Sequence, residues 1–150
     1  MIGASKTKPM EILLVEDGLT DAKVTIFALR RSQVFHRLTL VRSVKEAIQF
    51  LKCEGVFARA PQPDLILLDM MLPDGTGIDV LESMEAIDRD MNRTTTVVLT
   101  ASQDETLRKR CGELNVHDYI NKPVHEDKFM RVVRDNKKLM IHSTPMLVGT

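Results

Sequence analysis

Acidic residues follow two apolar runs of this 150-residue chain, at points where open α/β sheets usually place their chemistry. Asp69 ends the run 65–68, which predicts a buried strand, and a turn containing Pro, Asp and Gly comes after it. A second apolar run, 12–15, is followed by Glu16 and Asp17. Two strands that each bring carboxylates to one edge of a sheet predict a cation site with a reactive aspartate inside it.

Two more polar residues stand at the ends of segments that predict strands later in the chain. Thr100 ends the run 97–99, and Lys122 comes directly after the segment 117–121. Acids that lie close together raise one another's pKa values unless a cation intervenes, and all-oxygen ligation suits Mg²⁺. Lys122 can pair with Asp69 or with an oxyanion, and the Thr100 hydroxyl can donate to the same oxyanion. Together these groups predict phosphoryl transfer to a carboxylate.

Each of these residues alone has an ordinary structural explanation. An acid after a strand is commonly a turn or cap residue, and a single lysine is commonly solvated. Thr100 could cap a helix, and Pro123 could start one. The ordered set, with every member in register at the end of a strand, makes phosphoryl chemistry the favoured interpretation.

Segments typical of strands and helices alternate along the chain, which predicts a parallel sheet covered by helices on both faces. Strands are expected at residues 11–16, 37–41, 64–69, 95–100 and 117–121. A helix is expected after each strand, with starts at Thr20 or Asp21, Ser43, 75–77, Ser102 and Glu126. The last helix is expected to end near Ile141. The predicted fold class is therefore α/β, a doubly wound parallel sheet of five strands.

The composition limits the classes of function. The 21 basic and 21 acidic residues give no net charge, so no global field is present to hold nucleic acid or a membrane. No apolar run is long enough to span a bilayer. Cys53 and Cys111 lack metal-type spacing and are expected as free thiols in the cytoplasm. We expect a flexible lead at 1–9, one domain at 10–141 and a flexible tail at 142–150.

The chain resembles the receiver domains of two-component response regulators over about residues 10–141. The resemblance is carried by four segments that hold the strand ends described above, namely 12–17, 64–77, 97–101 and 118–123. It implies a flavodoxin-like (βα)5 fold with strand order 2-1-3-4-5. Among receivers, the chain looks most like the single-domain regulators that partner phytochrome-type histidine kinases.

The resemblance also implies a role for each residue of the site. Asp69 would be the phosphoacceptor, and Mg²⁺ would be held by Glu16, Asp17, Asp69 and the backbone carbonyl of Met71. Thr100 and Lys122 would contact the phosphoryl group. Tyr119 would be the switch aromatic, and the bond between Lys122 and Pro123 would be cis.

The partners implied by the resemblance are a histidine kinase or a phosphotransfer protein, with the first helix as the docking element. Phosphoryl acceptance and loss would be self-catalysed, so the chain is not expected to be an enzyme in its own right. A homodimer through the fourth helix, fifth strand and fifth helix is a further expectation. Its cross-molecule ion pairs would involve Arg108, Lys109, Arg110, Glu126 and Asp127.

Three other classes of protein share parts of this pattern. A phosphatase of the haloacid dehalogenase type needs a second acid two residues after the nucleophile, where this chain has Met71. A flavin-binding protein of the flavodoxin type needs aromatic surface, but the chain has one Tyr and no Trp. A receiver-like module that binds protein without phosphorylation is the remaining alternative, and such modules commonly lack one or more of the reactive residues. Asn115 stands where small Gly is common in the family, and Asn can still adopt a positive φ there.

Overall fold

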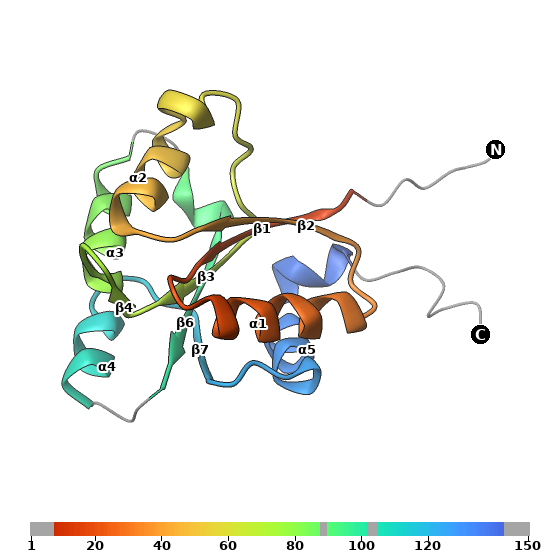
Figure 1. Ribbon diagram of the computed structural model, residues 1–150. Helices are drawn as coiled ribbons and strands as arrows, with labels where there is room; N and C mark the ends of the chain where they lie inside the picture. The colour runs from red at the N-terminus through yellow and green to blue at the C-terminus, as the bar shows by residue number, and fades with distance from the viewer. Residues whose placement is uncertain (1–7, 88–89, 102–104, 143–150) are drawn as a thin grey trace.

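A five-stranded parallel sheet forms the centre of the protein in a computed structural model that describes residues 8–87, 90–101 and 105–142 (Figure 1). The strands lie in the order β2-β1-β3-β6-β7. The predicted order 2-1-3-4-5 is confirmed, because β6 and β7 are the fourth and fifth strands of this sheet. The bounds are Met10–Val15 for β1, His36–Val41 for β2, Leu65–Asp69 for β3, Thr95–Thr100 for β6 and Asp118–Asn121 for β7.

Helices cover both faces of the sheet, as the alternation of elements predicts (Figure 1). One face carries α1 (Leu19–Arg31) and α5 (Glu126–Asp135), and the other carries α2 (Val44–Lys52), α3 (Gly77–Glu85) and α4 (Glu105–Gly112). Three short 3-10 helices complete the described fold, at Gly55–Phe57, Met91–Arg93 and Lys137–His142. None of the described helices is both long and apolar enough to cross a membrane.

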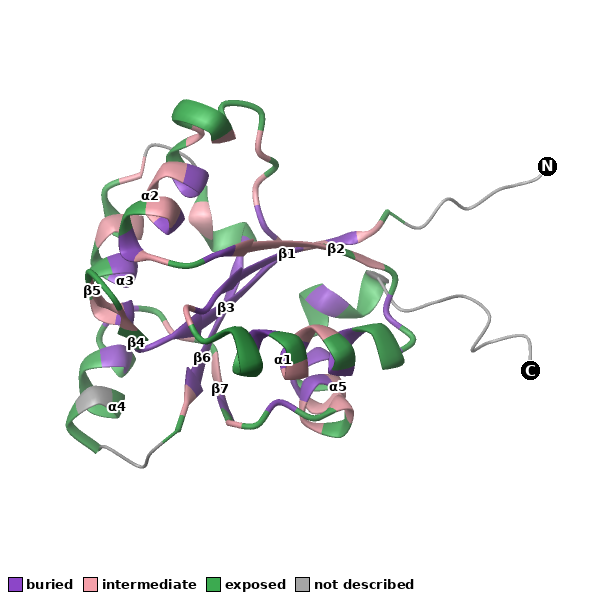
Figure 2. Cartoon of the chain, viewed as in Figure 1, coloured by how far each residue is buried: buried purple, intermediate pink, exposed green. Residues whose placement is uncertain are grey.

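The central strand β3 is buried along its whole length, which explains its unbroken apolar sequence (Figure 2). Its side chains alternate between two cores. Leu65 and Leu67 pack with α1 and α5, whereas Ile66 and Leu68 pack with α2, α3 and α4. Both faces of the strand are therefore dry, and only its carboxyl end at Asp69 meets polar groups.

Several ends of helices and strands differ from the sequence-based expectations. Gly18, not Thr20 or Asp21, is the N-cap of α1. The last helix ends at Asp135 rather than near Ile141, because Asn136 leaves the helical conformation with φ −117° and ψ 91°. The remainder of that expected helix is a 3-10 turn. Strand bounds shift by one residue in most cases, and the expected cap at Ser102 lies outside the described residues.

Other local expectations are confirmed. Ser43 caps α2, since its side chain accepts a hydrogen bond from the Glu46 N–H at 3.1 Å. Asn115 adopts a positive φ of 61°, and Cys53 and Cys111 form no disulfide within the described residues.

A small antiparallel hairpin, which the sequence did not predict, follows β3. It pairs β4 (Met71–Leu72) with β5 (Gly75–Thr76) and leads directly into α3. Asp74 at its tip reaches the start of α2, where its carboxylate accepts hydrogen bonds from the N–H groups of Val44 (2.8 Å) and Lys45 (3.0 Å). These two bonds lower the pKa of Asp74. The hairpin is thus anchored to a helix that precedes it by about thirty residues.

Replacing Asp74 by Ala should lower the free energy of unfolding by about 1 kcal/mol, the usual loss when a helix N-cap side chain is removed. Urea unfolding monitored by circular dichroism measures the change. Glu54→Ala is the matched control, because Glu54 is also exposed and precedes a short helix without capping it through its side chain. Equal midpoints for the two variants would contradict the capping role.

Candidate functional site

Lys122 gathers three carboxylates at the carboxyl edge of the sheet. Its ammonium nitrogen lies 2.7 Å from Glu16 Oε1, 3.0 Å from Asp69 Oδ2 and 3.2 Å from Asp21 Oδ2. Glu16 follows β1, Asp69 ends β3, and Lys122 follows β7, so three strand ends meet as parallel topology requires. The predicted convergence of these residues is therefore present in the fold.

Burial strengthens the electrostatic interactions between the charges of this cluster. Only 2% of the Glu16 side chain, 10% of Asp69 and 12% of Lys122 is exposed. Burial, together with the nearby Asp69, raises the pKa of Glu16 to about 6, although Lys122 and the Gly18 N–H act in the opposite direction. Burial disfavours the Lys122 ammonium, but Glu16 and Asp69 outweigh it and raise the pKa of Lys122. One lysine thus does not fully compensate the two buried acids.

A hydrogen bond and close packing hold Asp69 and its neighbours in place. The Asp69 Oδ1 accepts a hydrogen bond from the Met71 N–H at 3.3 Å. Gly77, the first residue of α3, lies so close that a Cβ there would stand 2.8 Å from the Asp69 carbonyl oxygen. Only glycine allows this approach. The Met71 side chain is 74% exposed, so at this position the chain offers its backbone to the site and its thioether to solvent.

Asp17 does not join the Lys122 cluster directly. Its carboxylate lies 3.5 Å from Nη2 of Arg42, and the same nitrogen donates to the Asp17 backbone carbonyl at 2.9 Å. Within the described residues, no three Asp, Glu, His or Cys side chains gather closely enough to form a ready-made metal cluster.

The donors nevertheless fit a hard divalent cation in kind. Glu16, Asp17 and Asp69 offer carboxylate oxygens, and the Met71 carbonyl follows Asp69 by two residues. Burial and the nearby Asp69 raise the pKa of Glu16, and Lys122 acts in the opposite direction. A second cation beside Glu16 would act in the same direction as Lys122.

Asp21 is a site residue that the sequence analysis treated only as a helix cap. It lies in the first turn of α1, and its Oδ2 contacts Lys122. An acid near the start of a helix has an ordinary explanation in the helix dipole, which hid its second role. Its position four residues after Asp17, close to the carboxyl end of β1, was the available signal.

The remaining predicted residues lie at the ends of β6 and β7. The Thr100 carbonyl accepts a hydrogen bond from the Lys122 N–H at 2.8 Å, so the two residues are adjacent across the sheet. The bond between Lys122 and Pro123 is cis, which confirms the expectation. Tyr119 is partly buried on β7, on the same face of the sheet as α4.

Comparison with known proteins agrees with this arrangement. The family model for the response regulator receiver domain matches residues 12–134, and the chain belongs to that family of two-component signalling proteins. Response regulator Rcp1 of Synechocystis sp. is 37% identical over 114 residues, which cover 76% of this chain and 77% of Rcp1.

Solved structures of receivers also superpose closely. The phosphorylated cyanobacterial phytochrome response regulator RcpA has a TM-score of 0.73 at 35% identity, covering 85% of this chain and 91% of RcpA. The Mn²⁺-bound form of Rcp1 has a TM-score of 0.73 at 32% identity, covering 90% and 96% of the two chains.

Without divalent cations, Glu16→Gln should stabilise the protein by on the order of 1–2 kcal/mol at pH 7.5. The folded-state pKa of about 6 exceeds the ordinary value of 4.5, so ionised Glu16 costs stability above pH 6, and the cost disappears as the pH falls toward 4.5. The gain should therefore vanish near pH 4.5.

Urea unfolding of both proteins at pH 7.5 and near pH 4.5 measures this difference. Glu54→Gln, a substitution at an exposed acid, serves as the control. Destabilisation by Glu16→Gln at pH 7.5 would show that the Lys122 pair outweighs the cost of burying the carboxylate.

Proposed function

We propose that Asp69 accepts a phosphoryl group from the phosphohistidine of a kinase or phosphotransfer protein. The bond between phosphorus and the donor imidazole breaks, and a bond forms between phosphorus and a carboxylate oxygen of Asp69. The observation that carries the proposal is the Glu16–Lys122–Asp69 cluster, which holds a strand-end carboxylate beside a buried ammonium group. The reaction is self-catalysed and follows the receiver family, so the chain is the acceptor rather than a turnover enzyme.

Mg²⁺ is the proposed cofactor of this step, bound by Glu16, Asp17, Asp69 and the Met71 carbonyl. When bound, it neutralises charge on the transferring group and on the acids. The Mn²⁺-bound form of Rcp1 supports a divalent ion in a related receiver. In this chain Asp17 also contacts Arg42, so the ion and that arginine compete for one carboxylate.

Phosphorylation then acts as a switch. Lys122 pairs with a phosphoryl oxygen, the Thr100 hydroxyl donates to another, and Tyr119 turns inward behind Thr100. The two states must differ by only a few kcal/mol, because a covalent mark can reverse no larger gap. The output is a protein contact or further phosphoryl transfer.

A receiver-like module that works without phosphorylation is less well supported. A module that only binds protein does not require a buried acid with a raised pKa beside a buried lysine. This chain has both, in Glu16 and Lys122. The dehalogenase-type alternative still lacks its second acid, because Met71 occupies that place with an exposed side chain.

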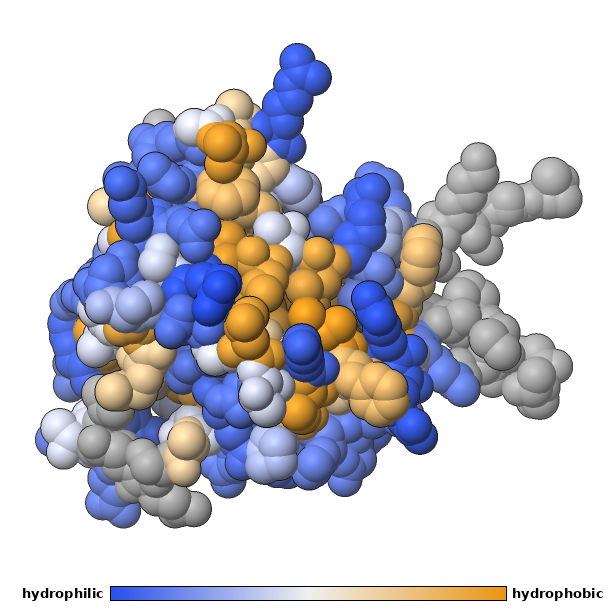
Figure 3. Space-filling view, in the orientation of Figure 1, coloured by the Kyte–Doolittle hydropathy of each residue, from blue (hydrophilic) through white to orange (hydrophobic). Residues whose placement is uncertain are grey.

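The proposed docking surface for the kinase is a groove between α1 and the segment after Lys122. Apolar side chains gather around α1 on the face seen in Figure 3. Phe27, which belongs to α1, is 60% exposed. The groove is lined by Lys23, Val24, Phe27, Arg31, Val124 and His125. Because Val124 lies two residues beyond Lys122, a helix docked here brings its histidine close to Asp69.

A homodimer through α4, β7 and α5 remains a further proposal, and several charges there already have partners within the chain. Arg110 contacts Glu82 at 2.6 Å and Glu113 at 3.0 Å, while Glu126 contacts Arg31 at 3.6 Å. Cross-molecule pairs would have to replace these contacts. We also propose a cytoplasmic location, in keeping with the family and with two cysteines that form no disulfide within the described residues.

Acetyl phosphate with Mg²⁺ should add one phosphoryl group to the protein, and Asp69→Asn should abolish the addition. Intact mass spectrometry measures the product. Asp90→Asn is the control, because Asp90 is exposed and lies in the loop before Met91–Arg93, away from the carboxyl edge. Equal labelling of Asp69→Asn and wild type would remove Asp69 as the acceptor.

Phe27→Ala should slow phosphoryl transfer from a cognate kinase by roughly tenfold, the effect of losing an aromatic anchor at an interface. Transfer from acetyl phosphate should be unchanged, because the small donor needs no docking surface. Radiolabel transfer with each donor makes the comparison. Phe35→Ala, at a similarly exposed aromatic before β2, should leave both rates unchanged. A loss with both donors would mean that Phe27 acts on the site itself.

A further inference from the structure

The ring of Tyr119 is held on its outer side by α4. The guanidinium carbon of Arg108 lies 4.6 Å from the ring centroid, in the arrangement of a cation–π contact. The Tyr119 hydroxyl also donates to the Arg108 backbone carbonyl at 3.4 Å. One residue of α4 thus contacts both the face and the hydroxyl of the ring.

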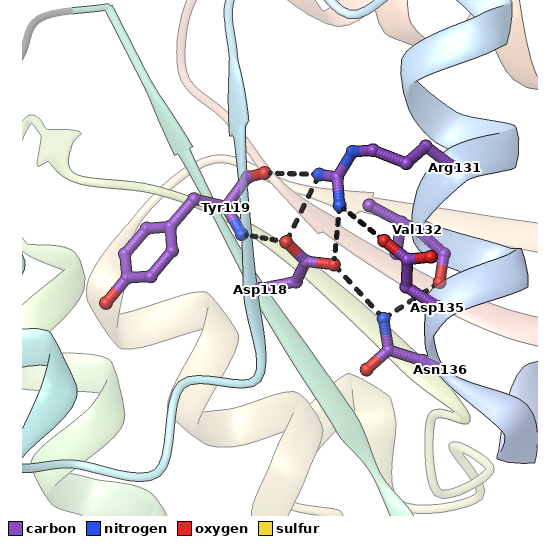
Figure 4. Close-up of polar contacts among 6 residues, drawn as sticks. All are labelled: Asp118, Tyr119, Arg131, Val132, Asp135 and Asn136. Atoms are coloured by element: carbon purple, nitrogen blue, oxygen red, sulfur yellow. Dashed lines mark hydrogen bonds and ion pairs between the residues drawn. The ribbon is translucent and has the colours of Figure 1, made fainter.

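The backbone of Tyr119 is held separately by α5 (Figure 4). The Tyr119 carbonyl accepts a hydrogen bond from Nη2 of Arg131 at 2.9 Å, and the Tyr119 N–H donates to Asp118 Oδ1 at 2.8 Å. The two terminal nitrogens of Arg131 also grip both oxygens of Asp118, each at 3.1 Å. The peptide groups on either side of the tyrosine are therefore linked through one guanidinium.

Further contacts from α5 and from Asn136 stabilise the pair of Arg131 and Asp118. Nη1 of Arg131 contacts Asp135 at 3.1 Å one helical turn away. Asn136 donates to Asp118 Oδ2 at 3.2 Å and to the Val132 carbonyl at 2.8 Å. Although burial alone would raise the pKa of Asp118, Arg131 and the neighbouring donors outweigh it and lower that pKa. The carboxylate thus stays charged and bound.

The position of β7 explains why such a brace is needed. β7 is the last strand of the described sheet and pairs only with β6, so one of its edges has no strand partner. Backbone groups on an open edge are normally left to water or to another chain. At Tyr119 they are occupied by Asp118 and Arg131, which leaves this stretch of backbone little freedom to shift.

We propose that Arg108 and Arg131 are positioning residues for the switch tyrosine, with separate roles. Arg131 fixes the β7 backbone, and Arg108 holds the ring outward, so that the ring moves while its backbone stays in place. Inward rotation of the ring then removes two contacts from α4 and none from α5. The inference rests on the proposed function only in taking Tyr119 as the switch.

The chain offers a clean probe of the ring, because Tyr119 is its one tyrosine. With tyrosine labelled by ¹³C, its ring signal reports the average of outward and inward positions. Loss of the cation–π contact in Arg108→Gln should raise the inward-to-outward ratio roughly two- to fivefold in the unphosphorylated protein. The signal should move along the line that joins the wild-type unphosphorylated and phosphorylated positions.

Lys109→Gln is the matched control, since it removes the same charge from an exposed neighbour on α4. Its ring signal should stay at the wild-type position. An Arg108→Gln signal that coincides with the control, or that leaves the line between the two states, would overturn the role of Arg108.

Arg131→Lys tests the backbone role while keeping the charge, because lysine cannot bridge the carboxylate and the carbonyl as a fork. Exchange of the Tyr119 amide hydrogen should quicken by roughly tenfold or more. Arg134→Lys, at an exposed position of α5, should leave the exchange rate unchanged. Unchanged exchange in Arg131→Lys would overturn the role of Arg131.

Failure of this inference is distinguishable from failure of the proposed function. The amide-exchange measurement requires no phosphoryl group, whereas labelling of Asp69 requires neither arginine. If Asp69 is not labelled but Arg131→Lys still loosens the amide, the backbone role of Arg131 stands and the switch does not.

Discussion

The contact between Lys122 and the buried acids Glu16 and Asp69 is the constraint on which the rest of the structure depends. A carboxylate in a nearly dry site is stable as an anion only beside a cation, and loss of that partner costs several kcal/mol. Because the three residues come from the ends of three different strands, the contact also requires the strand order and the parallel direction of the sheet. The charge cluster of the site can therefore form only when the sheet has this strand order and direction.

The same arrangement explains why the site favours the binding of a further cation. Lys122 offsets only part of the effect of burial on Glu16, whose pKa stays raised. A fully neutralised cluster would have little tendency to take up another cation. Natural proteins commonly keep such strain at functional sites and offset it through packing elsewhere, here in the two apolar cores around β3.

Sequence patterns predicted a parallel sheet because segments typical of strands alternate with helical segments, whereas the strand order was implied by the resemblance to receiver domains. They also predicted Glu16, Asp69, Thr100 and Lys122, since strand ends in such a sheet share one edge. Two contacts of the site were missed, those of Arg42 and of Asp21. Arg42 reaches Asp17 over 25 residues, and Lys122 reaches Asp21 over 101 residues. No local periodicity records contacts of this kind.

The end of α5 was missed for a different reason. Its apolar spacing continues beyond Asp135, because Leu139 is buried by a 3-10 turn instead of an α-helix. Periodicity thus reported burial correctly and helix type incorrectly. Asn136 carries the information that the pattern lacked, since its side chain bonds to Asp118 on another element and its backbone turns away.

The Asp74 anchor has a consequence for the order in which the chain acquires structure. Ser43 can cap α2 as soon as that helix forms, because it is its neighbour in sequence. The N–H groups of Val44 and Lys45 must wait for the hairpin after β3, about thirty residues later. Closing so long a loop has an entropic cost that only the assembled sheet can repay. The first turn of α2 therefore gains its bonds to Asp74 only after β3 and the hairpin have formed. The full stability of that turn depends on the cooperative folding of the whole domain.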